Sequence, residues 1–530
     1  MISSTGTSVT TAGGTGTLYI DKTDDNYGIG ENLTFNAAAA NNIAIGSEAL
    51  NNTSGDADEN VGIGTNALTE LTIGDENVAL GYRAMDGATT ANRCVVIGAD
   101  AGSEVMITNS GGSVPSYADG TVAIGFQSMY NLTSGAGNVA VGYNTGTAIT
   151  TGTYNTALGH VAFDAGGMGA SNPASHNVAI GNNAMGAVDE GDNDQSASHN
   201  IAIGTSALQG GILANTKDFQ YNIAIGGYAL DDTATNAQTG TIAIGYQALT
   251  ALTTGSVNLA IGYQALQHCV EGEANLAIGH GALGDWDADA TVDGSVHNVM
   301  VGRNAGGGAW ITAQSSYNVG IGNYVMDAAM NGALKNTAMG HNAATGIIDG
   351  DDNVAIGNEA GAAITSGSQN TCIGSDSASG AVGSTNQTAV GYGCTAVNTD
   401  NSVTLGNAAV TRIHMSQDAD AVMYADGTIN TSDERWKKNI EDSDLGLSFI
   451  NSVRPVKYNF KSDKQNSKLK YGIVAQEVIE VLKAIDREDF AGIETDDPDR
   501  LGADYVQFVA PLIKAVQELS AQVEELKNKQ

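Results

Sequence analysis

Basic side chains are scarce in this sequence: 22 Lys and Arg stand against 58 Asp and Glu, and the formal net charge is -36. A chain this acidic repels a polyanion, which argues against DNA or RNA as a partner. No apolar run approaches the ~20 residues that span a bilayer, so no membrane insertion is expected. The first residues lack the basic and apolar regions of a secretory signal, so a non-secreted protein is expected. Cysteine is also rare, and its spacing fits neither a disulfide framework nor a CxxC metal site: Cys94, Cys269, Cys372 and Cys394.

Proline and aromatic residues are few as well, with 5 Pro and 5% aromatics, whereas Gly is abundant. The 69 Gly among 530 residues are roughly twice the ~7% that is typical of proteins. They lack the every-third spacing of collagen, and 42% apolar residues are too many for plain disorder. No P-loop, dinucleotide fingerprint, HExxH or GxSxG motif occurs. The sequence therefore indicates a Gly-rich repetitive protein, and no cofactor is predicted.

A short motif recurs along most of the chain. Copies read NIAIGSEAL at 42–50, NVALGYRAM at 77–85 and NLAIGYQAL at 258–266. Nine of the 19 steps between successive repeat glycines are 17 residues, and the others are mostly longer by 1 to 10. A fixed step with additions predicts a solenoid with loops inserted into some coils. Gly30 fits a first copy, and the repeat glycines that follow are Gly46, Gly64, Gly81, Gly98, Gly125, Gly142, Gly159, Gly181, Gly204, Gly226, Gly245, Gly262, Gly279, Gly302, Gly322, Gly340, Gly357, Gly374, Gly391 and Gly406.

The chemistry of the repeat favours strands over helices. Asn-Val-Ala-Ile-Gly alternates with period two, its β-branched residues favour extended backbone, and Asn and Gly are typical of turns. The residue before Ile is small in nearly every copy, as at Ala44, Gly62 and Ala79, which indicates close packing there. One rung per repeat, at about 4.8 Å each, predicts a rod on the order of 100 Å long. Each coil is too short to bury much apolar surface, so stacking on neighbouring coils or other chains must supply the core.

These repeats resemble the head repeats of trimeric autotransporter adhesins, whose NxAIGxxA units wind into a left-handed parallel β-roll shared by three chains. The resemblance covers about 26–407 and is specific through repetition. It implies a trimeric parallel β-roll or solenoid shaft. The step of 17 or more residues is longer than that family's usual unit, so the coil shape is open. The absence of a signal peptide and a C-terminal membrane barrel argues against a bacterial surface adhesin of that type.

The composition changes near 430–432. The first 431 residues hold 7 basic and 39 acidic side chains, whereas 432–530 hold 15 and 19 and three of the five prolines. The last hundred residues are therefore expected to form a separate domain. Its final stretch, 505–530, is predicted to be a helix, and it reads either as a core helix of one chain or, as we favour, as a parallel coiled coil between chains. The apolar residues that step by 3 and 4 along it are Val509, Leu512, Val516, Leu519, Val523 and Leu526.

Four motifs in this last domain resemble the C-terminal intramolecular chaperone of phage tail spikes, endosialidases and neck appendages, which is also classed as a self-cleaving peptidase. They are NTSDERWKKNI at 430–440, LGLSFINSVRPVKYNFK at 445–461, YGIVAQEV at 471–478 and APLIKAVQEL at 510–519. The resemblance implies a domain that assembles three chains, helps the fibre to fold in register and then releases itself. The cut would fall between Thr431 and Ser432, with Ser432 as nucleophile and Lys437 as general base.

The proposed dyad is chemically reasonable. A Ser hydroxyl needs a base to remove its proton, and a Lys can act as that base when burial favours its neutral form. Asp433 and Glu434 oppose this, because nearby negative charge keeps a Lys protonated, and Lys438 is a second candidate base. The alternative is structural: Ser432 caps a helix and the basic side chains are simply solvated.

Other candidate sites lie on the shaft. Loops on a rigid scaffold are common binding sites, and two inserted segments carry a Trp that would suit a carbohydrate if exposed, which makes Trp286 and Trp310 receptor-binding candidates. The Asp-rich stretches at 285–293 and 349–352 could hold Ca²⁺, but solvated acidic loops are favoured and no metal site is predicted. Cys372 takes the small-residue position of its repeat. Rings that follow the repeat glycine form either a sugar-stacking edge or packing between rungs: Tyr82, Phe126, Tyr143, His160, Tyr246, Tyr263, His280, His341 and Tyr392.

Together these features predict a mainly β phage tail fibre: an attachment segment at 1–25, a β-roll shaft at 26–407, a connecting β segment at 408–431 and a small α-rich chaperone at 432–530. Its expected partners are two further copies, a host-surface glycan or protein, and phage tail or baseplate proteins. It would be made in the host cytoplasm and reside in the virion, with self-cleavage as its only chemistry. The alternative is a tail spike that depolymerises host-surface polysaccharide, which would need a pair of carboxylates at a fixed separation.

Overall fold

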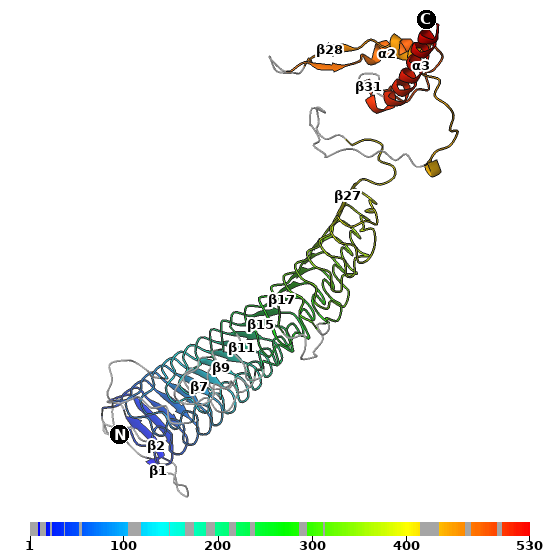
Figure 1. Cartoon of the computed structure of the whole chain (residues 1–530). Coiled ribbons are helices and arrows are strands. Elements are labelled where there is room, and N and C mark those ends of the chain that lie inside the picture. The colour runs from blue at the N-terminus through cyan, green and yellow to red at the C-terminus, as the bar shows by residue number, and fades with distance from the viewer. Residues whose placement is uncertain are drawn as a thin grey trace. The chain divides into compact units, whose positions relative to one another are not determined.

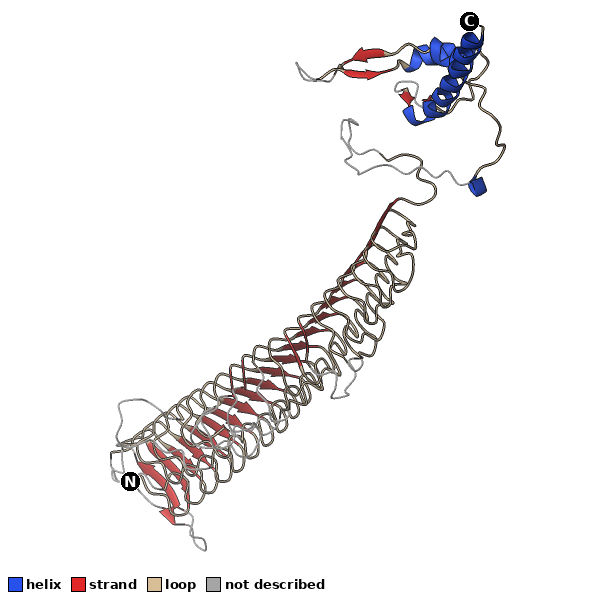
Figure 2. Ribbon diagram, viewed as in Figure 1, coloured by secondary structure: helices blue, strands red, loops and turns tan. Residues whose placement is uncertain are grey.

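The computed structural model describes residues 9–10, 17–21, 24–35, 38–51, 56–103, 118–147, 149–164, 174–186, 197–210, 219–233, 239–285, 294–310, 313–413, 434–461, 468–495 and 501–529. The chain divides into two compact units, Met1–Ile413 and His414–Gln530. The first unit is a β-solenoid, and all the described α-helices lie in the second (Figure 1; Figure 2).

Parallel strands, one per coil, form a single ladder along the solenoid (Figure 2). Pairing is in register, so that the middle residue of one strand meets the middle residue of the next, as Ala123 meets Ala140 and Ala140 meets Ala157. This confirms the predicted solenoid and the first copy at Gly30. The strands are β3 (Asn26–Gly30), β4 (Ile43–Ile45), β5 (Val61–Ile63), β6 (Val78–Leu80), β7 (Val95–Ile97), β8 (Val122–Ile124), β9 (Val139–Val141), β10 (Thr156–Leu158), β11 (Val178–Ile180), β13 (Ile201–Ile203), β15 (Ile223–Ile225), β16 (Ile242–Ile244), β17 (Leu259–Ile261), β19 (Leu276–Ile278), β21 (Val299–Val301), β22 (Val319–Ile321), β23 (Thr337–Met339), β24 (Val354–Ile356), β25 (Thr371–Ile373), β26 (Gln387–Val390) and β27 (Ser402–Leu405).

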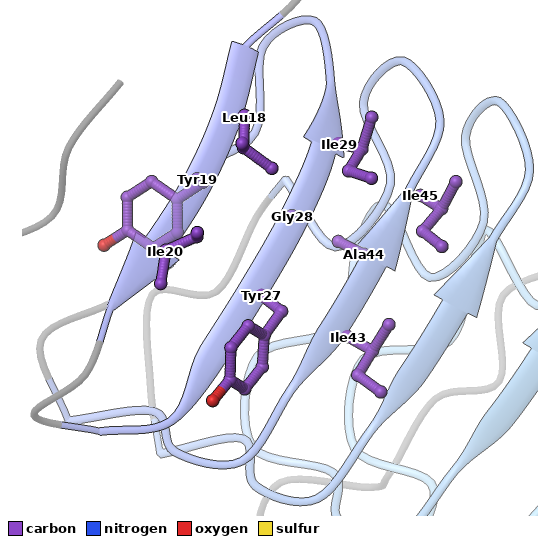
Figure 3. A pocket seen from close by; sticks show the side chains of 9 residues that line it. All are labelled: Leu18, Tyr19, Ile20, Tyr27, Gly28, Ile29, Ile43, Ala44 and Ile45. Atoms are coloured by element: carbon purple, nitrogen blue, oxygen red, sulfur yellow. The ribbon is translucent and has the colours of Figure 1, made fainter. Parts of the chain in front are cut away.

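A hairpin begins the ladder. Strands β1 (Val9–Thr10) and β2 (Thr17–Asp21) pair antiparallel with each other, and β2 pairs antiparallel with β3. Figure 3 shows β2, β3 and β4 side by side, with Ile43 and Ile45 flanking the buried Ala44. Part of the expected attachment segment therefore belongs to the same sheet as the shaft. Two short parallel pairs lie elsewhere on the coils: β12 (Ala197–Ser198) with β14 (Phe219–Gln220), and β18 (Gly272–Glu273) with β20 (Ser295–Val296).

The repeat glycine ends each strand because no other residue fits there. Gly142 has φ 146°, a conformation that L side chains rarely adopt. A Cβ atom on it would lie 1.9 Å from the carbonyl oxygen of Gly159 on the next coil. Successive coils therefore approach through their backbones at this column, and Gly181 and Gly204 meet in the same way although 23 residues separate them.

Small aliphatic side chains and a column of asparagines fill the interior. The middle residue of each strand, usually Ala, is buried, and Leu or Met from the following turn packs beside it. The Asn that precedes the strand is fully buried as well: Asn155 Nδ2 donates to Asn138 Oδ1 at 3.1 Å and to Ala174 O at 2.8 Å. The buried Asn residues are Asn26, Asn42, Asn60, Asn77, Asn138, Asn155, Asn177, Asn200, Asn222, Asn258, Asn275, Asn298, Asn318, Asn336, Asn353 and Asn370.

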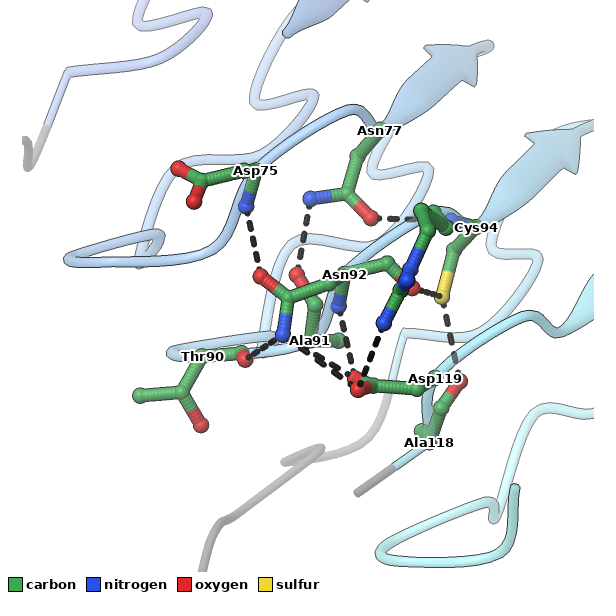
Figure 4. Close-up of polar contacts among 9 residues, drawn as sticks. Asp75, Asn77, Thr90, Ala91, Asn92, Cys94, Ala118 and Asp119 are labelled. Carbon is green, nitrogen blue, oxygen red and sulfur yellow. Dashed lines mark hydrogen bonds and ion pairs between the residues drawn. The ribbon is translucent and has the colours of Figure 1, made fainter. Parts of the chain in front are cut away.

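Cysteine interrupts the Asn column in one coil. Cys94 N donates to Asn77 Oδ1 at 3.0 Å, and its Sγ donates to Ala118 O at 3.1 Å (Figure 4). Burial raises the pKa of the Cys94 thiol to about 12. Cys372 is also buried, in the middle of β25 between Ala355 and Ala389, which confirms its expected role as a small core side chain.

The second unit is a small α+β fold around its own core. Two hairpins form it, β28 (Val456–Tyr458) with β29 (Lys470–Gly472) and β30 (Ile493–Glu494) with β31 (Gly502–Ala503), together with η1 (Glu434–Trp436), α1 (Leu447–Ser452), α2 (Ala475–Ala484), η2 (Tyr505–Phe508) and α3 (Val509–Asn528). The rings of Phe449, Phe490 and Phe508 meet in the core with centroids 5.2 to 6.1 Å apart. The predicted C-terminal helix is confirmed. Of the expected connecting segment, 408–413 contains no strand and 414–431 lies outside the described residues.

Candidate functional site

The solenoid presents a continuous apolar face, which we call the outer strand face. It consists of the first and third residues of the strands, which point away from the buried middle residue. Ile29 is 56% exposed and Met339 is 48% exposed, near opposite ends of the ladder. Because the strands pair in register, these side chains form one stripe along the ladder, in which Val, Ile and Leu predominate and Thr or Met takes a minority of positions. Apolar patches of this extent are typical of interaction surfaces.

Helix α3 presents a second apolar stripe. Its buried residues are Pro511 and Ala515, so this side packs on the domain's own core. Along the same side, the carboxylate of Glu518 accepts a hydrogen bond from Leu447 N, at the start of α1, at 2.8 Å. The predicted heptad residues are exposed instead: Val509, Leu512, Val516, Leu519, Val523 and Leu526 are 42 to 65% exposed. The alternative that these six residues pack in the core of one chain is therefore wrong.

Rings follow the repeat glycine and stack from coil to coil. Phe126, Tyr143 and His160 have centroids 5.2 to 5.3 Å apart and nearly parallel planes. This supports the interpretation that they pack between rungs, although Tyr143 remains 49% exposed. A second ring column precedes the buried Asn: Tyr154, His176, His199 and Tyr221 have centroids 4.9 to 5.3 Å apart. This column was not predicted from the sequence, although these four rings share one position in the repeat.

Acidic side chains have structural partners between coils. Asp75 Oδ1 accepts a hydrogen bond from Asp58 N at 2.8 Å, and Asp119 Oδ1 accepts one from Asn92 N at 2.9 Å (Figure 4). Asp351, one of the suggested Ca²⁺ ligands, accepts the backbone hydrogen bond of Leu334 at 2.8 Å. Within the described ranges, no group of three or more His, Cys, Asp or Glu side chains is placed to hold a metal ion.

Two carboxyl groups on the shaft are strongly perturbed. Burial raises the pKa of Asp231 to about 6, and the charge of Asp232 adds to the effect. Burial also raises the pKa of Asp327 to about 6, opposed by a hydrogen bond from Gly307 N and reinforced by the charge of Asp285. Perturbed carboxyl groups are candidates for functional sites, and Asp327 lies beside a polar hollow that is described below.

The predicted catalytic and receptor residues have different outcomes. Thr431, Ser432 and Trp286 lie outside the described residues. Lys437 follows η1, and its side chain is exposed in the single chain. Trp310 was expected to be exposed, but it is fully buried and its Nε1 donates to Gly306 O at 3.1 Å. Its insertion folds back into the solenoid core, so Trp310 offers no ring to a receptor.

The comparisons with known proteins identify the C-terminal unit. Residues 432–487 match the family model described as chaperone of endosialidase. The match begins at Ser432, where the composition changes. The hydrophobic core of this unit extends beyond the matched residues, because Phe490 and Phe508 belong to the same core as residues inside the match. No curated protein and no solved structure matches the chain.

A chaperone-of-endosialidase domain after a β-solenoid fits a tail fibre or tail spike with a C-terminal intramolecular chaperone. The chaperone domain carries one well-formed ion pair between its motifs: Arg454 Nε donates to Glu477 Oε2 at 2.9 Å, and this pairing lowers the pKa of Glu477. Among the helices that the structure describes, none is long and apolar enough to cross a bilayer.

Proposed function

We propose that the chain is a bacteriophage tail fibre that assembles as a homotrimer and binds the host surface through its shaft. The observation that carries this proposal is the match to a chaperone of endosialidase directly after a repetitive shaft. The shaft supplies a rigid scaffold, and the chaperone supplies the alignment that such a scaffold needs. Tail or baseplate proteins would hold the fibre in the virion.

Both units support assembly with further copies of the same chain. The outer strand face and the α3 stripe are each apolar, continuous and uncovered in one chain. Stripes that run along a shaft are best covered by the same stripe on another copy, because the lengths then match. By themselves, Val at the a positions and Leu at the d positions of α3 favour a coiled coil of two helices. The number three therefore rests on the resemblance of the shaft and the chaperone to trimeric families.

Register explains why such a shaft uses a chaperone. Coils with nearly the same sequence can pair one repeat out of step at little local cost, as weakly specified strands do. If a C-terminal clamp joins the three chains before their shafts pair, pairing begins at the same coil in every chain. Helix α3 is suited to be this clamp because its apolar stripe spans only 509–526 and lies outside the repeated coils.

Self-cleavage is the proposed chemistry. The Ser432 hydroxyl would attack the carbonyl carbon of Thr431 while Lys437 accepts the hydroxyl proton, and the Ser432 amine would be released as an ester forms. Water would then hydrolyse the ester and free the chaperone. Since Lys437 is exposed in one chain, we expect assembly to bury it and so to activate the cut only in the trimer.

Intact mass and assembly mass test this proposal together. The wild-type protein should yield a fragment that begins at Ser432, and Ser432→Ala and Lys437→Ala should both retain the 53.9 kDa chain. Lys438→Ala is the matched control and should still cleave. Light scattering of Ser432→Ala should give three times the chain mass. A monomer or a dimer would refute the trimer, and cleavage in Ser432→Ala would refute the dyad.

A further inference from the structure

A polar hollow of about 190 Å³ lies on the shaft between the coils at 262–285 and 302–307. It exists because a column of side chains loses one member. The position two residues after the repeat glycine holds Gln247 and Gln264 on two coils, Gly281 on the next and Asn304 on the one after. All four backbones are left-handed, with φ between 48° and 62°. The missing side chain at Gly281 is thus a gap in an otherwise regular column.

A second gap lies beside the first. The position five residues after the repeat glycine holds Gln267, then Gly284 and Gly307 on the next two coils, and then Asp327. Gly284 and Gly307 line the same hollow as Gly281. A Cβ atom on Gly307 would lie 2.8 Å from Asp327 Oδ1, so Asp327 lies directly beside this gap. Three glycines therefore leave one continuous space with polar neighbours.

Amide groups form the walls of the hollow. Gln264 Nε2 donates to Gln247 Oε1 at 3.1 Å, and Gln267 Nε2 donates to the same oxygen at 3.3 Å. Gly281 has no side-chain amide to continue this ladder, so position 281 offers no side-chain donor to the oxygens of Gln264 and Gln267. Asn304 lines the opposite side, where its Oδ1 would be 2.7 Å from a Cβ atom on Gly281.

An aromatic edge and a carboxylate complete the lining. His280 lies at the end of a stack with Tyr263 and Tyr246, whose successive centroids are 5.1 and 5.5 Å apart. Asp285 is exposed on the same coil, 4.0 Å from His268 Nδ1. The hollow thus combines amide donors and acceptors, one carboxylate and the edge of a ring stack.

We propose that this hollow binds one neutral pyranose unit of the host-surface glycan, an inference that rests on the proposed function of the shaft. Amide and carboxylate groups can satisfy adjacent hydroxyls as donors and as acceptors. The His280 ring can contact the apolar C–H face of the sugar. Asp285 and the net charge of -36 disfavour an acidic sugar. One unit fits rather than a chain of sugars, because the Gln264 and Asn304 columns close the hollow along the shaft.

Ligand-observed saturation transfer on the intact Ser432→Ala protein tests the inference. The probes are free glucose, galactose, mannose, rhamnose and N-acetylglucosamine, with glucuronate as the acidic comparison. At least one neutral sugar should receive saturation, and glucuronate should not. Gly281→Gln should reduce that signal at least tenfold, because a side chain at this position fills the hollow while Gln264 already shows that Gln accepts the same backbone conformation.

Gly393→Gln is the matched control. Gly393 occupies the same repeat position with φ 58°, and only Asn407 lies near its missing Cβ, at 3.8 Å. This variant should keep the full sugar signal. Three results would each overturn the inference: saturation of glucuronate alone, saturation of no sugar, or a sugar signal with Gly281→Gln as strong as that with the wild-type side chain.

Adsorption of the same proteins to bacterial cells separates the inference from the proposed function. Wild type and Gly393→Gln should adsorb to the host, and Gly281→Gln should adsorb at least tenfold less. Undiminished adsorption of Gly281→Gln would overturn the hollow as receptor site and leave the fibre function standing. No adsorption of wild type to any strain would count against the fibre function itself, and saturation transfer would still decide the hollow.

Discussion

Buried asparagines tie each coil of the shaft to the next. Asn155 Oδ1 accepts hydrogen bonds from Asn177 N at 3.0 Å and from Asn177 Nδ2 at 3.1 Å. Thr takes this position at Thr121 and Thr241 without breaking the strand ladder. The ladder therefore tolerates loss of the amide, but Thr241 Oγ1 is buried without a hydrogen-bond partner, so Thr does not reproduce the contacts that Asn makes between coils.

Replacing Asn155 by Ala should weaken the coils around it. The change leaves the donors of Asn177 and the carbonyl of Ala174 unsatisfied, which costs about 3 kcal/mol at ~1–3 kcal/mol per buried group. Asn155→Thr should cost nearly as much, because the hydroxyl of the Thr at the same position of another coil, Thr241, is buried without a partner. Hydrogen exchange at the neighbouring strands β9 and β11 measures the loss locally, as befits a repeat protein. Asn182→Ala, at an exposed site, should leave this protection unchanged. Protection in Asn155→Ala equal to that in the wild-type chain would contradict the role of the Asn column.

Asp231 should make the shaft less stable at neutral pH. Its pKa is raised from 3.8 to about 6 by burial, so the folded chain holds the proton more tightly than the unfolded chain does. The resulting stabilisation is present below about pH 4 and is lost as pH rises through about 6. Asp231→Asn should therefore raise stability at pH 7 by about 1 kcal/mol, discounted for partial exposure, and have little effect at pH 4. Thermal melting at both pH values checks this, with exposed Asp376→Asn as the unaffected control.

Helices α1 and α3 stabilise each other through one capping contact. Gly446, which precedes α1, has no side chain to keep the Glu518 carboxylate away, and Glu518 Oε2 accepts from Leu447 N at 2.8 Å. A carboxylate at a helix N-terminus also interacts favourably with the helix dipole. The contact joins Leu447, inside the family match, to Glu518, beyond it, so we expect the two parts of the domain to unfold together.

Glu518→Ala should destabilise the chaperone domain by about 1.5 kcal/mol, the worth of a charged hydrogen bond that is partly exposed. Helical circular dichroism during urea unfolding reports on this unit selectively, because the described α-helices all lie in it. Glu525→Ala is the matched control on the same helix: Glu525 pairs with Lys529 at the surface, and such pairs contribute ~0–1 kcal/mol. Equal loss from the two variants would show that the cap contributes nothing specific.

The strands and α3 were predictable because each repeats a simple period. Ala140 and Ala157 share a position in the motif, and in-register pairing places them in contact. The environment of Trp310 was not predictable in this way, because an insertion breaks the period and only folding decides whether its side chain turns inward. The hollow at Gly281 was missed for a related reason: it arises from coils at 262, 279 and 302, whose steps differ in length, so their side chains had to be aligned in space first.

Charge and apolar surface have opposite effects on contacts between two copies of the shaft. The shaft carries most of the net charge of -36, and like charges on adjacent shafts repel. The outer strand face contains few of these charges, since most of its positions are held by Val, Ile and Leu and the others mainly by Thr, Met and Tyr. Repulsion elsewhere on the surface therefore disfavours random contacts between shafts, and in the proposed trimer it would favour contact through the outer strand face.

Deleting 432–530 should allow shafts to associate out of register through the outer strand face. Without the clamp, three copies can meet through the outer strand face at any of many coils, so we expect insoluble protein or species of mixed mass rather than one trimer. Ser432→Ala is the control, because it keeps the chaperone attached and should give a single trimer of uniform length by electron microscopy. Shafts cut after folding by the wild-type chaperone should remain soluble trimers, since alignment is needed only once. Soluble, uniform trimers from the deleted gene would show that the shaft sets its own register and would remove the reason for the chaperone.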